Sequence, residues 1–213
     1  MKIKKIGHCC LLIKTNGLTI LTDPGAYSDG QNSLKGIDII LITHEHPDHL
    51  HSDSVKEIMK NNPHAVIITN SGVGKLLDEM EIAYQLLEGS ATTQVQDVSI
   101  EAFDGKHEEI FEEFGQVQNT GYFIDKKLFY PGDSYINPQK KVDVLALPVA
   151  GAWCKVPDAI RYALAVKPLK AFPVHDGMIE SDKFRPFHFV TGKTLSEHGI
   201  HFTPMKAGEE GEF

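Results

Sequence analysis

Residues 38–51 read DIILITHEHPDHLH. The first six, DIILIT, form a continuous apolar run, which is typical of a β-strand buried on both faces of a sheet. Pro47 ends any extension of that strand, and histidines occupy positions 44, 46, 49 and 51 around it. The stretch therefore predicts a buried strand that leads into a histidine-rich loop.

Strand-like and helix-like segments alternate along the rest of the chain. β-favouring runs predict strands at residues 2–6, 9–14, 18–22, 38–43, 65–69, 98–103, 120–124, 127–130, 143–148, 170–174 and 200–203, and Val95 is expected to share the one-sided burial of Val98, Ile100 and Ala102. Apolar spacing predicts helices that begin at Ser54 with a Ser54–Glu57 capping box, cover 72–80, begin at Pro157 and end near Gly199. With no internal repeat or linker, residues 1–213 are expected to form one layered α/β domain.

Composition narrows the class of protein. The formal charge is −8, whereas a protein that grips nucleic acid usually carries a basic face. No apolar stretch approaches the roughly 20 residues that span a bilayer, and the start of the chain lacks the apolar core of a signal peptide. We expect a cytoplasmic protein with a small-molecule substrate and no nucleic-acid or membrane partner, and leave a homo-oligomer open.

The histidine cluster indicates a metal site. His44, His46 and His49 lie with Asp48 within six positions. Charged imidazoles this close would repel one another, so these side chains are expected to be neutral and convergent. Neutral imidazole is the commonest protein ligand of divalent metals. The motif H-x-H-x-D-H directly after a buried strand therefore predicts a metal site rather than an exposed loop.

Three later residues share this setting, because each is a ligand-type side chain just after a predicted strand: His107, Asp133 and His175. Open α/β sheets gather ligands at these carboxyl ends of strands. His64 precedes its strand and is rejected as a ligand. The predicted set is therefore His44, His46, Asp48, His49, His107, Asp133 and His175. One tetrahedral metal needs only four ligands, so seven fit two metals that share a bridge, for which the Asp133 carboxylate is the candidate.

The motifs resemble those of the metallo-β-lactamase-fold hydrolases. The H-x-H-x-D-H motif at 44–49, His107, the Gly132-Asp133 pair and His175 follow that family's order. The segments IGHCC at 6–10, LTILTDP at 18–24 and KAGEE at 206–210 resemble a branch of small single-domain enzymes related to ascorbate-6-phosphate lactonase. The resemblance implies a four-layer αβ/βα sandwich of two mixed β-sheets with helices on the outer faces.

The resemblance also implies which residues hold which ion. One ion would be held by His44, His46 and His107, and the other by Asp48, His49 and His175. Asp133 would bridge the two ions, which would share a hydroxide. Two divalent ions are expected, with zinc as the first choice and manganese or iron as alternatives.

Two more residues are expected around the ligands. Asp23 corresponds to a family residue that orients a ligand histidine, and such partners tune metal affinity. His8 lies either beside the site or in the core as a hydrogen-bonded histidine, and we include it with Asp23 among the supporting residues.

The predicted reaction is metal-assisted hydrolysis. Two metals lower the pKa of a shared water from 15.7 toward about 7, and the hydroxide attacks an ester, lactone or phosphoester. Asp48, His49 and Asp133 are the catalytic residues in this interpretation. The net positive charge of the loaded centre favours a small anionic metabolite. Trp153, Arg185 and His188 are weaker candidates for substrate binding, and His188 is also a candidate acid for the leaving group.

Two other functions stay open. An iron-dependent redox enzyme of the same fold would use the same ligand types, and so would a non-catalytic metal-bound sensor. An exported class B β-lactamase is disfavoured, because the family pattern for those enzymes has Cys where Asp133 stands. A nuclease is disfavoured by the acidic charge and by the length of 213 residues.

Overall fold

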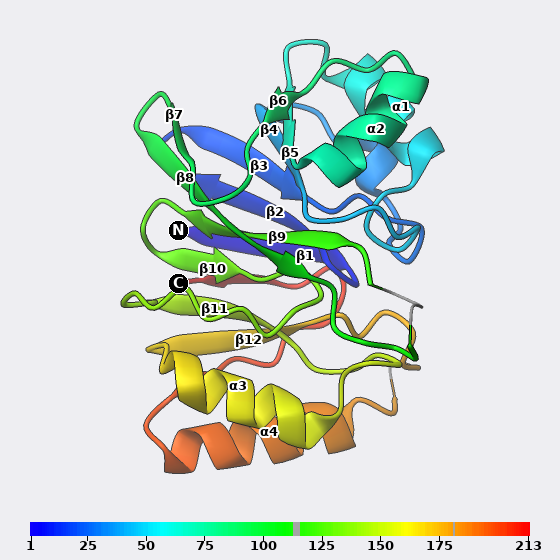
Figure 1. Ribbon diagram of the computed structural model, residues 1–213. Coiled ribbons are helices and arrows are strands. Elements are labelled where there is room, and N and C mark those ends of the chain that lie inside the picture. Colours follow the sequence, from blue (N-terminus) through cyan, green and yellow to red (C-terminus); the bar gives the residue numbers. More distant parts are fainter. Residues whose placement is uncertain (113–115, 181) are drawn as a thin grey trace.

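The computed structural model describes residues 1–112, 116–180 and 182–213. Two seven-stranded sheets pack face to face (Figure 1). The first sheet has the order β14 (Glu210–Glu212), β1 (Lys2–Gly7), β2 (Cys10–Thr15), β3 (Leu18–Thr22), β4 (Ile39–Ile42), β5 (Val66–Thr69) and β6 (Gln85–Leu86). The second has the order β13 (His201–Phe202), β12 (Lys170–Val174), β11 (Val144–Pro148), β10 (Leu128–Tyr130), β9 (Gln118–Ile124), β8 (Val98–Lys106) and β7 (Thr92–Val95).

Helices cover the outer face of each sheet. α1 (Ser52–Asn61) and α2 (Ser71–Glu79) pack on the first sheet, and α3 (Val156–Val166) and α4 (Arg185–Glu197) pack on the second (Figure 1). A short 3-10 turn, η1 (Gln31–Ser33), contacts α1. The four layers confirm the predicted αβ/βα sandwich of two mixed sheets.

The run IILI of β4 shows why both faces of the strand are apolar. Ile39 and Leu41 point into the core between the two sheets, whereas Ile40 and Ile42 point into the layer beneath α1 and α2. All four side chains are fully buried. Burial of each one contributes about 1.5–3 kcal/mol relative to exposure, so the strand is fixed from both sides.

Strand direction explains where polar side chains collect. In the first sheet β1, β3 and β4 run the same way, because β1 and β3 are each antiparallel to β2 and β4 is parallel to β3. In the second sheet β8, β10, β11 and β12 also share one direction. The carboxyl ends within each set therefore lie at one edge of their sheet.

Several local predictions differ from the structure. α1 begins at Ser52, and His51 rather than Ser54 is the flanking residue at its start, so the predicted capping box is wrong. The Ser54 hydroxyl instead lies 2.9 Å from His51 Nδ1. The predicted strand at 98–103 lies within β8, whereas Val95, expected to share its one-sided burial, ends the separate strand β7, which a turn with Gln96 at φ 49° joins to β8. The C-terminal strand β14, which pairs with β1, was not predicted.

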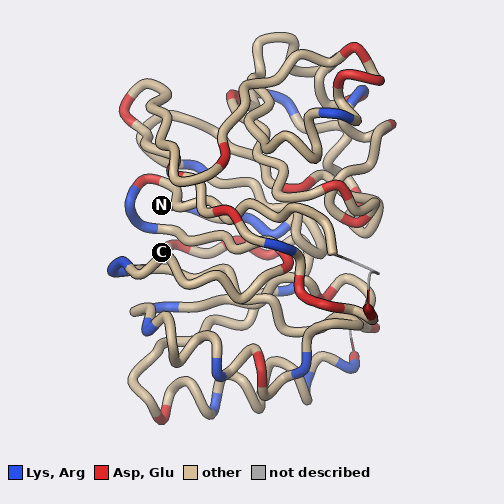
Figure 2. The backbone as a smooth tube through the Cα atoms, in the orientation of Figure 1, with Lys and Arg blue, Asp and Glu red and all other residues tan. Residues whose placement is uncertain are grey.

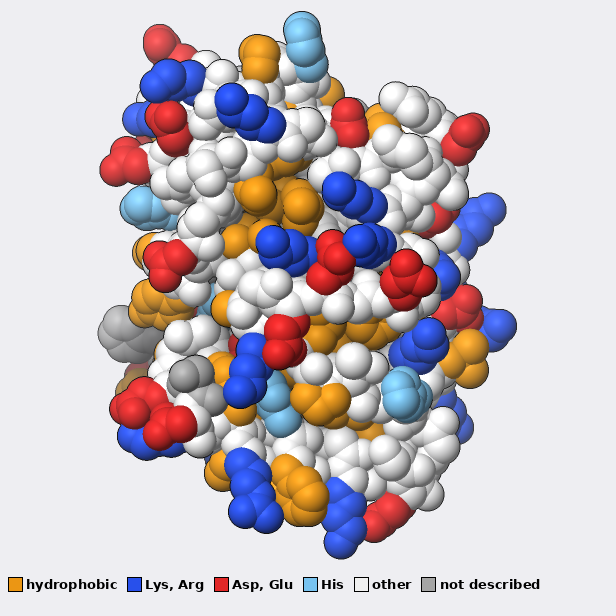
Figure 3. Space-filling view, turned by 180° about the vertical axis from the view of Figure 1, so that it is seen from behind, with side chains coloured by type: hydrophobic (Ala, Val, Ile, Leu, Met, Phe, Trp, Pro, Cys, Tyr) orange, Lys and Arg blue, Asp and Glu red, His pale blue; other side chains and the backbone are white. Residues whose placement is uncertain are grey.

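Charged side chains of both signs are distributed over the molecule. Figure 2 shows Lys and Arg interspersed with Asp and Glu along the described chain. The face shown in Figure 3 likewise mixes acidic and basic side chains with hydrophobic ones. None of the helices in residues 1–112, 116–180 and 182–213 has the length and apolar content needed to cross a bilayer.

Candidate metal centre

The carboxyl ends of four strands bring the predicted ligands together. β4 leads into His44, β8 into His107, β10 into Asp133 and β12 into His175. The backbone N–H of Thr120 in β9 donates to the carbonyl oxygen of the residue before His44, which joins the two sheets beside the cluster. Residues that are scattered over the sequence therefore meet at one site.

The cluster contains two sets of ligand atoms. His44, His46 and His107 each offer an atom within 4.8 Å of the others, and so do Asp48, His49 and His175. Asp133 lies between the sets. Its Oδ2 is 3.2 Å from Nε2 of His107 and 2.8 Å from Nε2 of His175, and its Oδ1 is 3.1 Å from Nε2 of His49. The structure thus brings all seven predicted ligands together.

Buried atoms without partners show that the site fits cations. Nε2 of His44, His49 and His175 and Oδ1 of Asp133 are buried, and none of them has a hydrogen-bond partner. Although His49 Nε2 and Asp133 Oδ1 are close, they are not aligned for a hydrogen bond. Buried polar atoms normally have partners, so four orphaned nitrogen and oxygen atoms that face one space are what divalent metals would satisfy.

Hydrogen bonds behind the ligand rings set their tautomers. In each ring Nδ1–H donates a hydrogen bond to an acceptor behind the ring. The acceptors are Asp23 Oδ2 at 2.7 Å for His49, Glu108 O at 2.5 Å for His107, Ala150 O at 2.5 Å for His175 and Thr43 Oγ1 at 3.0 Å for His44. In neutral imidazole the other nitrogen then carries the lone pair. Nε2 of each ring is therefore left free to bind a metal.

Asp23 is the centre of the hydrogen bonds beneath the ligands. Its fully buried carboxylate accepts from His49 Nδ1–H, from the Thr43 N–H and hydroxyl at 2.8 Å each, and from the Tyr130 hydroxyl at 2.7 Å. The geometry agrees with the orienting role expected of Asp23. Sequence reasoning missed Thr43 and Tyr130, whose only signal is that each lies at the end of a strand that carries a ligand.

The backbone conformation just before Asp133 requires a glycine at position 132. Gly132 has φ 65°, and a Cβ there would lie 2.3 Å from Asn119 Oδ1 and 2.9 Å from the Cβ of Thr43. The same Asn119 oxygen accepts the backbone N–H of Asp133 at 3.0 Å. Glycine is needed because only a residue without a side chain tolerates both the φ and this close approach.

His8 has the opposite tautomer. The backbone N–H of Gly177 donates to its Nδ1 at 3.0 Å, so the proton of the neutral ring is on Nε2, 3.2 Å from Asp48 Oδ2. Burial lowers the pKa of His8 to about 4, which keeps the ring neutral. His8 lies within 4.8 Å of the second ligand set. Both nitrogens of the ring are therefore engaged, Nδ1 by the Gly177 N–H and Nε2 by Asp48, which is the arrangement expected of a supporting residue.

The charges within the cluster also favour cations. Burial alone would raise the pKa of Asp133, but His175 and His49 hold it well below its ordinary value. Burial lowers the pKa of His44 far below its ordinary value, and His49 adds to that effect. The pKa of Asp48 is also lowered: burial alone would raise it, but the bond with His8 and the nearby His49 and His175 together outweigh that effect. The site therefore combines ionised carboxylates with a neutral imidazole at His44.

Trp153 contacts the centre, whereas two other predicted substrate-binding residues do not. The Trp153 indole N–H donates to Asp133 Oδ2 at 3.1 Å, and its ring packs beside His107 and His175. The Arg185 side chain is exposed on α4 and lies over the ring of Phe189. His188 is buried on the same helix, 2.9 Å from Asp176. Within the described residues, neither has a hydrogen bond or ion pair with the seven predicted ligands.

Comparisons with known proteins identify the family. The model of the beta-lactamase superfamily domain matches residues 2–175. Protein Rv0786c of Mycobacterium tuberculosis is 32% identical over 187 residues, which cover 85% of this chain and 87% of that protein. A UPF0173 metal-dependent hydrolase of Sulfolobus acidocaldarius is 26% identical over an alignment 239 positions long, gaps included, which covers 99% of each chain.

A solved structure supports the fold. Igni18, a metallo hydrolase from Ignicoccus hospitalis, superposes with a TM-score of 0.74 at 19% identity, over 100% of this chain and 98% of that one. The resemblance to the ascorbate-6-phosphate lactonase branch stays a prediction. Fold, ligand cluster and family match agree, and the chain belongs to the beta-lactamase superfamily, among its metal-dependent hydrolases.

Proposed function

We propose that this protein hydrolyses an ester, lactone or phosphoester bond of a small anionic metabolite at a pair of divalent metal ions. The observation that carries the proposal is the convergence of two ligand sets on Asp133, with four buried atoms left without partners. The hydrolase relatives among the UPF0173 proteins support the reaction class.

Each ion would be held by one set of ligands. His44, His46 and His107 would hold the first ion, Asp48, His49 and His175 the second, and Asp133 would be shared. Zinc suits these ligands best, and manganese or iron would also be accepted. When bound, the ion pair supplies a bridging hydroxide as nucleophile and polarises the oxygen of the scissile group.

The protein's own side chains orient the reactants. His46 is half-buried and the Asp48 side chain is 18% exposed, whereas the other ligands are buried, so substrate would enter on the side of these two residues. His8 fixes Asp48 through Nε2–H, which donates to Oδ2, the carboxylate oxygen that also lies 3.6 Å from Nε2 of His175. Trp153 holds Asp133 through its indole N–H, which donates to Oδ2.

The substrate class follows from charge. Two divalent ions would outweigh the charges of Asp48, Asp133 and a hydroxide, so the loaded site would be locally positive in a chain of net charge −8. A positive site of this kind attracts carboxylate or phosphate groups. We therefore expect substrates with an anionic group near the bond that is cleaved.

Metal analysis combined with a substrate panel tests this function. We expect about two ions per chain and turnover of a lactone or phosphoester that is lost with a chelator and restored by zinc or manganese. His46→Ala should lose most of this activity. The control His51→Ala, two residues after the predicted ligand His49 but outside the cluster, should not. A single ion or less per chain in metal-replete protein would overturn the proposal, and bound iron with a visible absorption band would favour a redox enzyme instead.

A further inference from the structure

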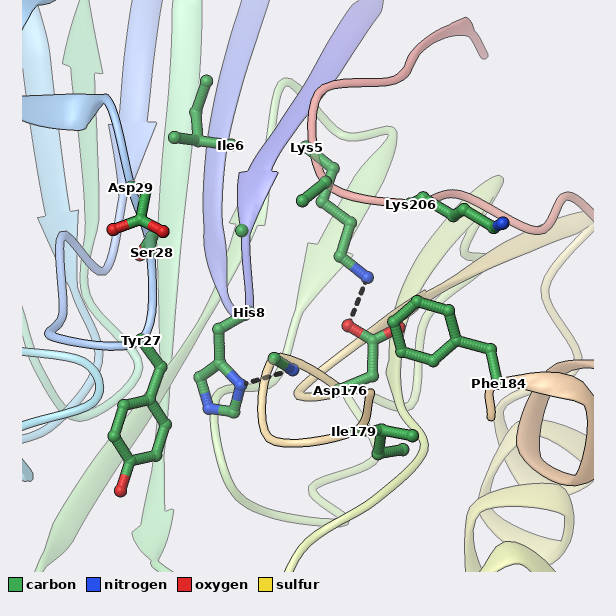
Figure 4. Close-up of a pocket in the computed structure, with 13 residues that line it drawn as sticks. Lys5, Ile6, His8, Tyr27, Ser28, Asp29, Asp176, Ile179, Phe184 and Lys206 are labelled. Atoms are coloured by element: carbon green, nitrogen blue, oxygen red, sulfur yellow. Dashed lines mark hydrogen bonds and ion pairs between the residues drawn. The ribbon is translucent and has the colours of Figure 1, made fainter. Parts of the chain in front are cut away.

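A fully buried lysine lies beside the metal centre. Lys5, on β1, is 1% exposed, and its Nζ is 2.6 Å from Asp176 Oδ1, 2.9 Å from the carbonyl oxygen of Pro173 and 3.3 Å from that of Met205 (Figure 4). An ammonium group has three donors, so every one of them has an acceptor. Lys5 thereby joins β1 of the first sheet to the segments on either side of His175.

Asp176 is held from a second side as well. It directly follows the predicted ligand His175, and its Oδ2 is 2.9 Å from Nε2 of His188 on α4. The three side chains are all buried, and Lys5 and Asp176 border a cavity of about 320 Å³ whose wall includes His8 (Figure 4). The carboxylate is therefore fixed between the first sheet and the outermost helix of the second.

The backbone around His175 needs this support. His175 has φ 60°, in the left-handed region, which a residue other than glycine adopts only where its surroundings hold it there. Its N–H donates to the carbonyl oxygen of His8 at 3.2 Å, and the N–H of Gly177 donates to the His8 ring at 3.0 Å. Lys5 and His8 thus attach the end of β1 to three consecutive residues, 175–177.

Stability alone does not account for such an ion pair. Removing two charges from water costs about as much as their attraction returns, and apolar residues of the same size are often equally stable or more so. The location of the pair next to a strained ligand residue offers another reason for it. We propose that Lys5, Asp176 and His188 are positioning residues that hold His175 against the second ion and so set the affinity of that site. The inference rests on the proposed function only in requiring that His175 holds an ion.

The double variant Lys5→Met/Asp176→Leu tests this role. It removes both charges, so no unpaired charge is left buried. Ion affinities are measured by titration against a competing chelator, with zinc and with manganese, and unfolding is followed by circular dichroism. We expect the ion held by His175 to bind about 10–100-fold more weakly, while the other ion and the unfolding midpoint change little. His188→Leu, a milder variant, should weaken the same ion several-fold.

Two further variants serve as a control and as a test of partial recovery. Lys2→Met/Glu210→Leu removes an exposed ion pair of 2.7 Å between β1 and β14 and should leave both ion affinities unchanged. Lys5→Gln/Asp176→Asn retains a neutral hydrogen bond and should recover part of the lost affinity. Wild-type affinity for every bound ion in both Lys5→Met/Asp176→Leu and His188→Leu would overturn the inference. A different outcome is that the affinity for the ion held by His175 falls in the variants while the wild type hydrolyses no substrate or binds only that one ion. In that case the proposed function fails and the positioning role stands.

Discussion

The indole N–H of Trp153 lies 3.1 Å from Oδ2 of Asp133, the carboxylate between the two ligand sets. Trp153 is the only tryptophan in the chain, and its ring centre is 5.6 Å from that of His107 and 5.4 Å from that of His175. The tryptophan fluorescence of this protein, excited at wavelengths that tyrosine does not absorb, therefore comes from a single side chain in direct contact with the proposed metal centre.

Metal binding should change that fluorescence. Cations bound to the Asp133 carboxylate change the charge next to the indole N–H of Trp153. We therefore expect a change in Trp153 emission that saturates when the ions are bound. Titration of chelator-treated protein with zinc or manganese measures it. Asp133→Asn should reduce both the change and the amount of bound metal. Constant emission while mass spectrometry finds bound ions would show that the ions lie elsewhere.

The tautomer of His8 leads to a prediction that tests whether His8 donates a hydrogen bond to Asp48 or binds a metal ion. His8→Phe removes the bond to Asp48 and should lower kcat/KM about 10–100-fold, the effect typical of losing a partner behind a metal ligand. The number of bound ions should not change, because both nitrogens of His8 are already engaged. His8→Gln, which can accept from Gly177 and donate to Asp48, should be affected less. Loss of one ion in His8→Phe would make His8 a ligand.

The buried hydroxyl of Tyr130 should contribute measurably to stability. Tyr130→Phe removes a donor from the Asp23 carboxylate, and a hydrogen bond to a charged group is worth about 1.5–3 kcal/mol. Urea unfolding measures the change in the free energy of unfolding. Tyr84→Phe is the matched control, because its hydroxyl is 3.4 Å from Asp78 at an exposed site and should change stability by less than about 0.5 kcal/mol. Equal effects of the two variants would contradict the role given to Asp23.

Glu88 should make stability depend on pH. Its Oε2 accepts the N–H of Ser71, the first residue of α2, and the side-chain N–H of Gln118, both at 2.9 Å. The Ser71 N–H, followed by the Gln118 side chain, lowers the pKa of Glu88 below its ordinary value of 4.5. A lowered pKa in the folded state stabilises the protein above pH 4.5, and this contribution disappears as the pH falls through the folded value.

Comparison with Glu88→Gln isolates that effect. The wild type should be more stable than the variant at neutral pH by about 0.3–1 kcal/mol, the size of an anion's effect at an exposed helix N-terminus. The difference should shrink as the pH falls below 4.5. Unfolding free energies of both proteins across this range measure it, and a difference that grows at low pH would reverse the assigned sign.

The sequence predicted the ligand cluster because each ligand obeys a local rule. His44, His107, Asp133 and His175 all follow an apolar strand, and strand direction then brings those strand ends to one place. Runs such as IILI predicted strands that are covered on both faces, whereas the sandwich of two sheets was implied only by the resemblance to the metallo-β-lactamase-fold hydrolases.

Interactions between distant residues could not be predicted in this way. Lys5 meets Asp176 across 171 positions, and the tautomer of His8 depends on the N–H of Gly177, 169 positions away. Neither contact leaves a periodic or spacing signal. Arg185 and His188 were proposed for substrate binding from residue type alone, but the rotation of α4 directs Arg185 to the surface and His188 to Asp176.

The central claim is that seven side chains from residues 44–175 hold two ions around Asp133. Anomalous diffraction from crystals of the zinc- or manganese-loaded protein tests it directly. We predict two peaks about 3.5–4 Å apart, one about 2.0–2.1 Å from the Nε2 atoms of His44 and His107 and the other equally close to those of His49 and His175, with Asp133 touching both. A single peak, or peaks away from Asp133, would contradict the account.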